Sequence, residues 1–197
     1  MRILVIGATG NIGAVAAATL EARGHEVLRA SRSTTPSVDI ADPGSVGALF
    51  EAVGIVDAVV VASGSVPFKP LAELAREDYQ AGLTSKTLGQ VEVVRQALEH
   101  LPDGGSITLT TGVLAREPIA TGAAAALVNG ALESFVVTAA AEAPRGLRIN
   151  AVSPNVLENS PGYHALFPGQ PQVTDEEIGR AFVLSVEGLG TGRILAV

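Results

Sequence analysis

The chain has 197 residues, of which 47% are hydrophobic and 17% charged, with a formal net charge of −7 and no cysteine. This length suits a single domain, and the hydrophobic share suits strands that are buried on both faces. The lack of cysteine excludes disulfides, thiolate metal sites and a cysteine nucleophile, and the acidic balance argues against nucleic-acid binding.

Apolar runs such as Ala58–Ala62 and Ala123–Val128 fall far below the roughly 18 residues of a membrane helix. The N-terminus enters a strand directly and has no signal-peptide layout. The three histidines are dispersed, with no carboxylates clustered near them, so no metal site is expected. We therefore expect a cytoplasmic protein with no membrane and no nucleic-acid partner.

Short apolar runs alternate with longer helical patterns along the chain. Strands are predicted at Arg2–Ile6, Glu26–Ala30, Ala58–Ala62, Ser106–Thr110, Leu147–Val152 and Arg193–Val197. Helices are predicted over Asn11–Arg23, from Asp42-Pro43, over Asp78–His100, over Ile119–Glu142, and after a capping box that opens at Thr174. This alternation predicts one α/β domain over residues 1–197, a doubly wound parallel sheet of the Rossmann fold in three α/β/α layers.

A glycine pattern follows the first strand and opens the first helix. Gly7 permits a tight turn, Gly10 lets the backbone approach a pyrophosphate, and Gly13 lets the helix pack closely on the strand. Free N–H groups at the helix start favour a phosphate, so the loop with Thr9, Asn11 and Ile12 predicts a dinucleotide site. The alternative is a glycine-rich turn without a ligand.

The end of the second strand distinguishes the two nicotinamide cofactors. An NAD site carries an acid there, whereas this chain carries Ser31, Arg32 and Ser33, which suit a 2′-phosphate. The sequence therefore predicts NADP(H), unless Arg32 is only a solvated surface arginine. Asp39, followed by Ile40, either accepts a hydrogen bond from the adenine amino group or serves as a loop aspartate.

In this order and spacing, the motifs resemble those of the short-chain dehydrogenase/reductase family over nearly the whole chain. Val61-Ala62-Ser63-Gly64 stands where the family usually has Asn-Asn-Ala-Gly, and Leu147–Pro154 resembles the strand that leads to the nicotinamide. Asn155 replaces the glycine of the usual Pro-Gly. The resemblance implies further cofactor contacts from Ala62, Ser63, Gly64, Pro154, Asn155 and Val156.

The family's active site holds an Asn, a Ser, a Tyr and a Lys, and this chain departs from it. The resemblance puts Ala125 at the tyrosine, Asn129 at the lysine, Thr111 at the serine and Lys86 at the asparagine. In the family the tyrosine donates the proton to the carbonyl oxygen. Because Ala125 has no proton to give, ordinary carbonyl reduction is in doubt.

Four residues are candidates for a rebuilt site. Lys86 is either a proton donor or a surface lysine on a long helix, and Thr111 either donates to a substrate oxygen or is structural. Asn129 either binds a ribose hydroxyl or serves packing. Tyr163, with its neighbour His164, lies in the expected substrate loop at about 155–173, as a proton donor or as a packed or exposed residue.

The first hypothesis is an NADP(H)-dependent oxidoreductase with non-standard proton delivery, acting on a small, uncharged carbonyl or alcohol. The alternatives are a non-redox isomerase, dehydratase or cyclase on the same fold, or a non-catalytic NADP(H)-binding module. Small residues on the Ile119–Glu142 helix allow close helix packing. Since the resembled family pairs subunits through this helix and the one before it, a homodimer or homotetramer is expected, although packing within one chain explains the same residues.

Overall fold

The computed structural model describes residues 1–197 and contains one six-stranded parallel sheet in the order β2-β1-β3-β4-β5-β6. The strands are β1 (Arg2–Ile6), β2 (Glu26–Ala30), β3 (Ala58–Val61), β4 (Ser106–Thr110), β5 (Arg148–Ser153) and β6 (Ile194–Ala196). The strand order reverses at β1, which pairs with both β2 and β3. In open sheets of this kind, ligands bind beyond the carboxyl ends of the strands at such a switch point.

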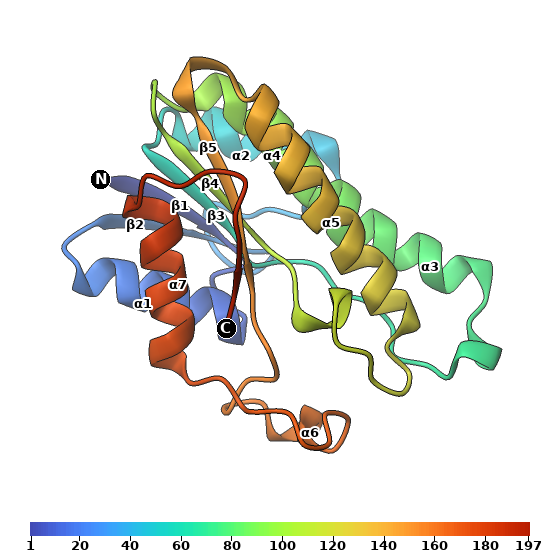
Figure 1. Ribbon diagram of the computed structural model, residues 1–197. Helices are drawn as coiled ribbons and strands as arrows, with labels where there is room; N and C mark the ends of the chain where they lie inside the picture. Colours follow the sequence, from blue (N-terminus) through green and yellow to red (C-terminus); the bar gives the residue numbers. More distant parts are fainter.

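Helices cover both faces of the sheet (Figure 1). On one face lie α1 (Asn11–Ala22) and α7 (Asp175–Glu187), and on the other lie α2 (Pro43–Val53), α4 (Gly89–His100) and α5 (Ala123–Glu142). Alternate residues of β1 enter the two cores, because successive strand side chains point to opposite faces. The predicted three-layer Rossmann fold is thus confirmed.

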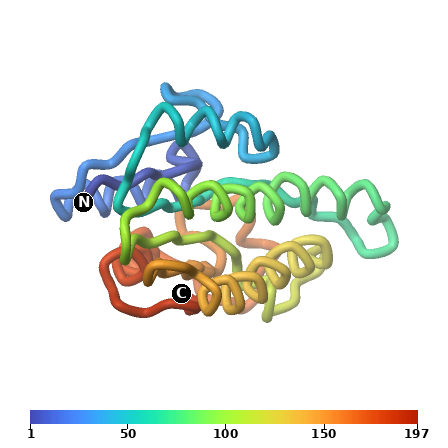
Figure 2. Tube along the Cα trace, turned by 90° about the horizontal axis from the view of Figure 1, so that it is seen from above, coloured from blue at the N-terminus to red at the C-terminus, as the bar shows by residue number.

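The long helix expected over Asp78–His100 is interrupted in the structure. An α-helix, α3 (Arg76–Gly82), passes into a π-helical segment, Leu83–Leu88, before α4 begins at Gly89. Seen from above, α3 and α4 form one continuous rod beside α5 (Figure 2). A π segment adds one residue to the turn and often occurs at functional sites. Lys86 lies in this segment.

Several predicted boundaries shift by a few residues. The helix expected from Ile119 begins at Ala123, because Thr121 takes a left-handed φ of 66° that an α-helix does not accept. Asp42 caps α2 by accepting from the backbone N–H of Gly44, and Thr174 forms the predicted capping box of α7 with Glu177. The short helix α6 (Pro161–His164) lies in the segment expected to form the substrate loop.

Helix α5 is apolar enough to qualify as a candidate membrane span by length and composition, with a mean hydropathy of 1.5 over its best window. Asn129, Glu133, Ser134 and Thr138 interrupt its apolar residues, so no long apolar run marks it in the sequence. In the structure α5 packs beside β5 and places Leu132 and Val136 in the core. A core helix of this fold has the same composition, and 39% of the window is buried here.

Candidate functional site

The loops that follow β1 to β5 meet at one edge of the sheet and enclose two neighbouring cavities. The first, of about 430 Å³, lies beyond β1, β2 and β3. The second, of about 340 Å³, lies between α5, the π-helical segment and residues 154–167. Gly64 and Ser65 line both cavities, so the two adjoin.

The glycine loop after β1 leads directly into α1 and forms one wall of the first cavity. Gly7 has a φ of +85°, and a Cβ on it would lie 2.2 Å from the carbonyl oxygen of Ala62. A Cβ on Gly13 would lie 2.1 Å from the oxygen of Gly7, so close helix packing requires glycine there. Around Gly10 the nearest atom to such a Cβ is 3.5 Å away, which leaves room for a ligand beside the backbone.

The predicted nucleotide residues divide between the cavities. The first is lined by Gly7, Thr9, Gly10, Ser31, Arg32, Ser33, Asp39, Ile40, Ala62, Ser63 and Gly64. Ile12, Pro154, Asn155 and Val156 line the second, together with Gly64. Asn11 and Gly13 line neither: Gly13 packs against the glycine loop, and Asn11 Nδ2 donates to Ser160 Oγ at 2.9 Å.

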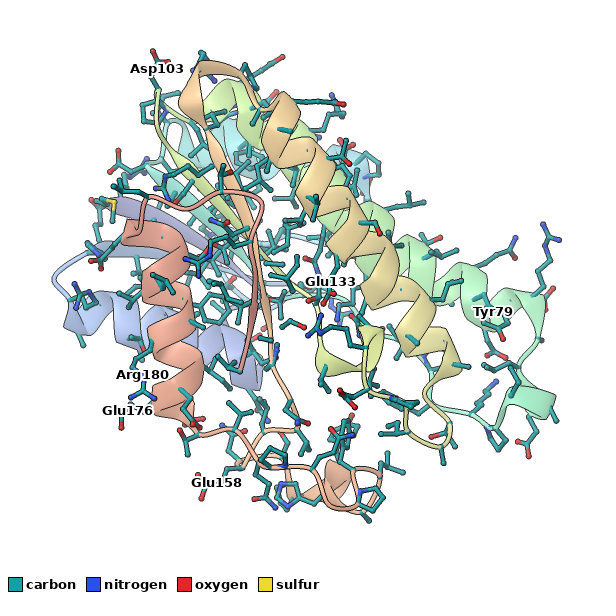
Figure 3. All side chains as sticks on the ribbon, viewed as in Figure 1. Tyr79, Asp103, Glu133, Glu158, Glu176 and Arg180 are labelled. Carbon is teal, nitrogen blue, oxygen red and sulfur yellow. The ribbon has the colours of Figure 1, made fainter.

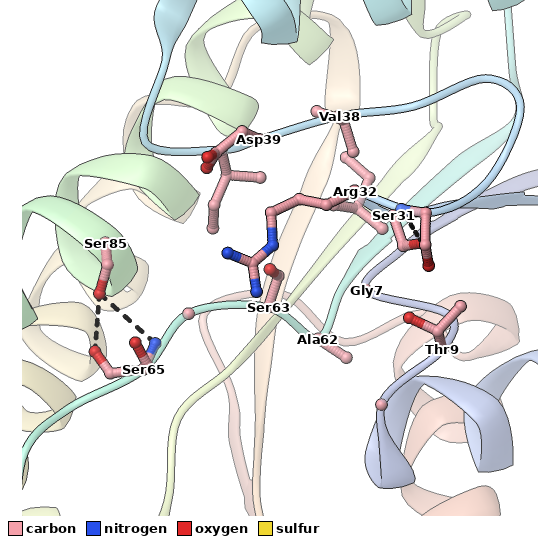
Figure 4. A pocket seen from close by; sticks show the side chains of 15 residues that line it. Gly7, Thr9, Ser31, Arg32, Val38, Asp39, Ala62, Ser63, Ser65 and Ser85 are labelled. Atoms are coloured by element: carbon pink, nitrogen blue, oxygen red, sulfur yellow. Dashed lines mark hydrogen bonds between the residues drawn. The ribbon is translucent and has the colours of Figure 1, made fainter.

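Arg32 reaches across the first cavity from the end of β2 (Figure 4). Its side chain is exposed, and its guanidinium lies between Asp39 and Ser63 in that view. Ser31 and Ser33 hydroxyls lie 3.2 Å apart beside it. One Asp39 oxygen accepts from the N–H of Ala41 at 3.0 Å, which is the loop role that the sequence left open. A cation and two hydroxyls at this place suit a 2′-phosphate.

The first N–H groups of α1 have no acceptor within the helix, as at any helix start, and they carry its positive dipole end. With the space at Gly10 and the cation at Arg32, the first cavity therefore fits a phosphorylated dinucleotide.

Lys86 extends from the π-helical segment to the wall of the second cavity. Its Nζ donates to Asn129 Oδ1 at 2.8 Å and to the Thr111 backbone oxygen at 3.2 Å. Burial lowers the pKa of Lys86 to about 8, against the opposing effect of the Glu133 carboxylate. An ammonium has three hydrogens, so two are held by these acceptors and one remains for a ligand.

Gly64 allows Lys86 to pack directly against the backbone that follows β3. With a φ of +115°, a Cβ there would lie 2.6 Å from the Cβ of Lys86. The strand end and the π segment are also joined by Ser85, whose hydroxyl donates to the oxygen of Ser65 at 2.7 Å (Figure 4). The structure thus brings Lys86, Asn129 and Thr111 together beside the second cavity.

The hydroxyl of Thr111 does not face a ligand as a free donor. It donates to Glu133 Oε1 at 3.0 Å, and the residue is 3% exposed. A carboxylate can only accept, so the hydroxyl hydrogen is committed to Glu133. The expectation that Thr111 donates to a substrate oxygen is therefore not met, and the structural alternative describes it better.

Residues 155–173 close the far side of the second cavity. Tyr163 lines the cavity but is 51% exposed, and its ring lies 6.0 Å from that of Phe68. His164 is engaged elsewhere, because its ring nitrogens contact the Leu157 oxygen and Gln172. Tyr163 therefore belongs to the wall of the second cavity, and His164 holds the segment in shape.

Two polar residues behind these cavities, one buried and one partly buried, were not predicted from the sequence. Gln90, fully buried on α4, donates to the oxygens of Ser63 and Thr110 and accepts from the Thr110 N–H, which fixes the ends of β3 and β4. Glu133 points from α5 toward the sheet edge (Figure 3). It lies one helical turn after Asn129, and that i, i+4 spacing indicates only that the two residues share a helix face.

Comparison with known proteins agrees with this geometry. A family model described as enoyl-(acyl carrier protein) reductase matches residues 7–182. Hydroxynaphthalene reductase-like protein Arp2 of Metarhizium brunneum (strain ARSEF 3297) is 31% identical over 160 residues, which cover 76% of this chain. The match spans only 60% of that curated relative's length.

Two solved structures are similar over the whole chain. The protein lin1944 from Listeria innocua is 44% identical, with a TM-score of 0.97 and coverage of 100% of this chain and 99% of that one. A small-chain dehydrogenase crystallised in complex with NADPH is 28% identical, with a TM-score of 0.89 and coverage of 100% and 96%. Together with the family model, which matches most of the chain, these likenesses show that the chain belongs to the short-chain dehydrogenase/reductase family.

Proposed function

We propose that the chain is an NADP(H)-dependent oxidoreductase of small, uncharged carbonyl or alcohol substrates, in which Lys86 takes the place of the usual tyrosine as proton donor. The observation that carries the proposal is the position of the Lys86 ammonium at the wall of the second cavity. Two of its hydrogens are held by Asn129 and Thr111, which leaves one for a substrate oxygen.

The nucleotide would be held by the glycine loop and the Ser31–Ser33 segment. The N–H groups at the start of α1 suit the pyrophosphate, and Arg32 with its two serine neighbours suits the 2′-phosphate. The similar dehydrogenase that was crystallised with NADPH supports this choice of cofactor. NADPH, when bound, supplies the hydride.

The chain itself supplies the proton and the alignment of its donor. A lysine with a pKa of about 8 is largely protonated at neutral pH, yet it is a stronger acid than an ordinary lysine. Asn129 Oδ1 and the Thr111 oxygen fix the direction of the remaining N–H. Ala125, which also lines this cavity, offers a methyl group where the resemblance implies a tyrosine, and so leaves the lysine accessible.

The substrate class follows from the walls of the second cavity. Apolar side chains dominate it, among them Phe68, Leu114, Val156 and Phe167. The proposed substrate loop, residues 155–173, contains no Arg or Lys. With Lys86 as its lone cation, the cavity suits a neutral molecule with one oxygen to protonate, and not a phosphate or a carboxylate.

We further propose that the chain acts in the cytoplasm and pairs with a second copy through α4 and α5. Leu88, Leu127 and Val137 are 59%, 47% and 55% exposed, and they lie on the π segment that leads into α4 and on α5. A dimer would cover such apolar side chains. Sedimentation equilibrium across a range of protein concentrations tests the pairing; a monomer at every concentration would refute it.

The function is tested by following nicotinamide absorbance with NADPH and a panel of neutral aldehydes and ketones. We expect substrate-dependent consumption of NADPH, with Lys86→Met lowering kcat by roughly 10²–10⁴-fold while calorimetric NADPH binding stays within a few-fold. Lys69→Met is the matched control, since Lys69 is the other lysine of the chain and pairs with Asp78 outside both cavities.

Binding of NADPH without turnover of any substrate would overturn the oxidoreductase and favour a non-redox enzyme or a non-catalytic NADP(H)-binding module. Turnover that Lys86→Met leaves unchanged would overturn the role of Lys86 alone.

A further inference from the structure

Behind the second cavity, Glu133 gathers three donors from three different parts of the chain. Thr111 Oγ1 and Ser153 Oγ both donate to Glu133 Oε1 at 3.0 Å, and Arg116 Nη1 pairs with Oε2. Arg116 Nη2 also donates to Ser153 Oγ at 2.9 Å. We call these four residues the Glu133 cluster. Its acid is 14% exposed and its arginine 38% exposed.

The cluster determines where the hydroxyl hydrogens point. An ionised carboxylate accepts hydrogen bonds and donates none, so both hydroxyls must turn their hydrogens toward Glu133. Thr111 therefore has only lone pairs to offer on its other side. Lys86 is therefore the residue that can donate a proton to a ligand beside Asn129.

The cluster also bears on the charge of Lys86. Lys86 Nζ contacts the Thr111 oxygen, while the hydroxyl of the same threonine contacts Glu133. Asn129, the second acceptor of Lys86, lies one helical turn before Glu133 on α5. Two hydrogen bonds, both made by Thr111, thus connect the Glu133 carboxylate to the Lys86 ammonium. The two groups lie in a partly buried place where screening by water is weak.

Several segments pack around Lys86, and each carries ionisable residues except residues 62–68. Helix α5 brings Glu133, the turn after β4 brings Arg116 and Glu117, and the substrate loop brings Glu158, Tyr163 and His164. Helix α3 brings Arg76, Glu77, Asp78 and Tyr79. Residues 62–68, which pass over the π segment, contain no ionisable side chain. Among these groups, the Glu133 carboxylate is the charge that raises the pKa of Lys86 against its burial, and Arg116 pairs with that carboxylate.

We propose that Glu133 is a positioning residue, which keeps Lys86 in its ammonium form and turns the Thr111 hydroxyl hydrogen away from the cavity. Arg116 acts in the opposite sense, because it neutralises part of the carboxylate charge. This inference rests on the proposed function for its catalytic meaning, but its electrostatic content is measured without turnover.

The chain offers an unusually clean probe, because Lys69 and Lys86 are its only lysines. Protein labelled with ¹³C-lysine gives two Cε resonances in a carbon–proton NMR spectrum, and Lys69→Arg assigns them. Titration of the Lys86 resonance follows its protonation directly. The comparison uses the parent chain, Glu133→Gln, which keeps the shape and one acceptor oxygen, and Arg116→Met, which keeps much of the apolar stem.

We expect the Lys86 midpoint to move to lower pH in Glu133→Gln and to higher pH in Arg116→Met, each by on the order of half a pH unit or more. The opposite signs separate electrostatics from loosened packing, which would bring both midpoints nearer that of a solvated lysine. The Lys69 resonance serves as the internal reference in all three proteins. Unchanged midpoints, or shifts of the same sign, would overturn the proposal.

The pH profile of NADPH-dependent reduction gives the second readout. In the parent chain kcat falls as pH rises through the Lys86 midpoint, and the falling limb should follow the NMR midpoint in each variant. Opposite NMR shifts without any turnover would keep the role of Glu133 in charging Lys86 and reject the proposed function. Turnover whose falling limb ignores the NMR shifts would reject the link between Glu133 and catalysis.

Discussion

Lys86 in the π-helical segment contacts Asn129 on α5, with Nζ of the lysine 2.8 Å from Oδ1 of the asparagine. The resemblance to the family implies an asparagine at the first position and a lysine at the second, so in the proposed alignment the two residue types exchange places. The exchange keeps an amine and a carboxamide in contact at the sheet edge, but brings the amine from the π segment and not from α5.

Burial of Lys86 should make the free energy of unfolding depend on pH. The pKa of Lys86 is lowered to about 8 by burial, below its ordinary value of 10.5, so the unfolded chain binds its proton more tightly than the folded chain. Stability from this group therefore rises as pH increases from about 8 to 10.5. Relative to Lys86→Met, the parent's free energy of unfolding should gain roughly 2–4 kcal/mol across that window.

Urea unfolding of both proteins at several pH values between about 7 and 10 measures this difference in unfolding free energy. Most of the expected gain falls within this pH range. Lys69→Met serves as the control and should show little pH dependence. A flat difference between parent and Lys86→Met would contradict the burial of the charged group.

Arg32 should decide the preference between the two nicotinamide cofactors. Arg32→Asp replaces a cation with an anion beside the proposed 2′-phosphate site, so NADPH affinity should fall about 10–100-fold while NADH affinity changes much less. Isothermal titration calorimetry measures both. Arg180→Asp on α7, which lines neither cavity, is the control for net charge. Equal losses for NADPH and NADH would reject the assignment.

The glycine loop should separate stability from nucleotide binding. Gly13→Ala drives a methyl group into the backbone of Gly7, so we expect a loss of about 3 kcal/mol or more in unfolding free energy. Gly10→Ala meets no atom closer than 3.5 Å, so stability should change by less than about 1 kcal/mol. Its methyl group occupies the space beside the phosphate loop, and NADPH affinity should fall. Thermal unfolding and calorimetry of the two variants make the comparison.

A second charge cluster joins the two helices of the α1–α7 layer. Arg23 Nη2 donates to Glu187 Oε2 at 2.6 Å and His25 contacts the other oxygen, which lowers the pKa of Glu187 to about 2. Because this pKa is depressed, the stabilisation is present above the ordinary value of 4.5 and is lost as pH falls from there toward 2. Glu187→Gln should cost about 1 kcal/mol at neutral pH and nearly nothing at the acid end.

Chemical denaturation at neutral and at acid pH tests this dependence. Glu176→Gln provides the comparison, since Glu176 is 80% exposed in an i, i+4 pair with Arg180 and should contribute little at either pH. A cost at Glu187 that persists unchanged in acid would show that the contact is not ionic.

The sequence was sufficient for the architecture because its local signals are strong. Apolar strands such as Arg2–Ile6, the cap at Asp42 and the capping box at Thr174 each depend on neighbours within a few residues, and all three are confirmed. The order of the motifs then indicated the family. The interruption of the Asp78–His100 helix was not predictable, since helical periodicity does not reveal one additional residue in a turn.

Within the site, only residues whose own side chain is typical of the proposed chemistry could be predicted from the sequence. Lys86 and Asn129 could be paired through the resemblance, whereas the partner of the Thr111 hydroxyl could not, because Glu133 is 22 residues away and reads as a solvated helix charge. The same limit applies to Gln90, whose three hydrogen bonds reach two strand ends. Such contacts depend on tertiary packing, which no local pattern encodes.

The π-helical turn at Leu83–Leu88 also has an evolutionary consequence. Because a π turn arises when one residue is inserted into an α-helix, removal of a single codon from this stretch would restore a regular helix between unchanged ends. Each residue of an α-helix rotates the chain by about 100°, so the deletion would carry Lys86 off the cavity wall while both flanking helices kept their packing. One insertion or deletion, without any change of side chain, therefore separates a fold that presents this amine to a ligand from one that does not.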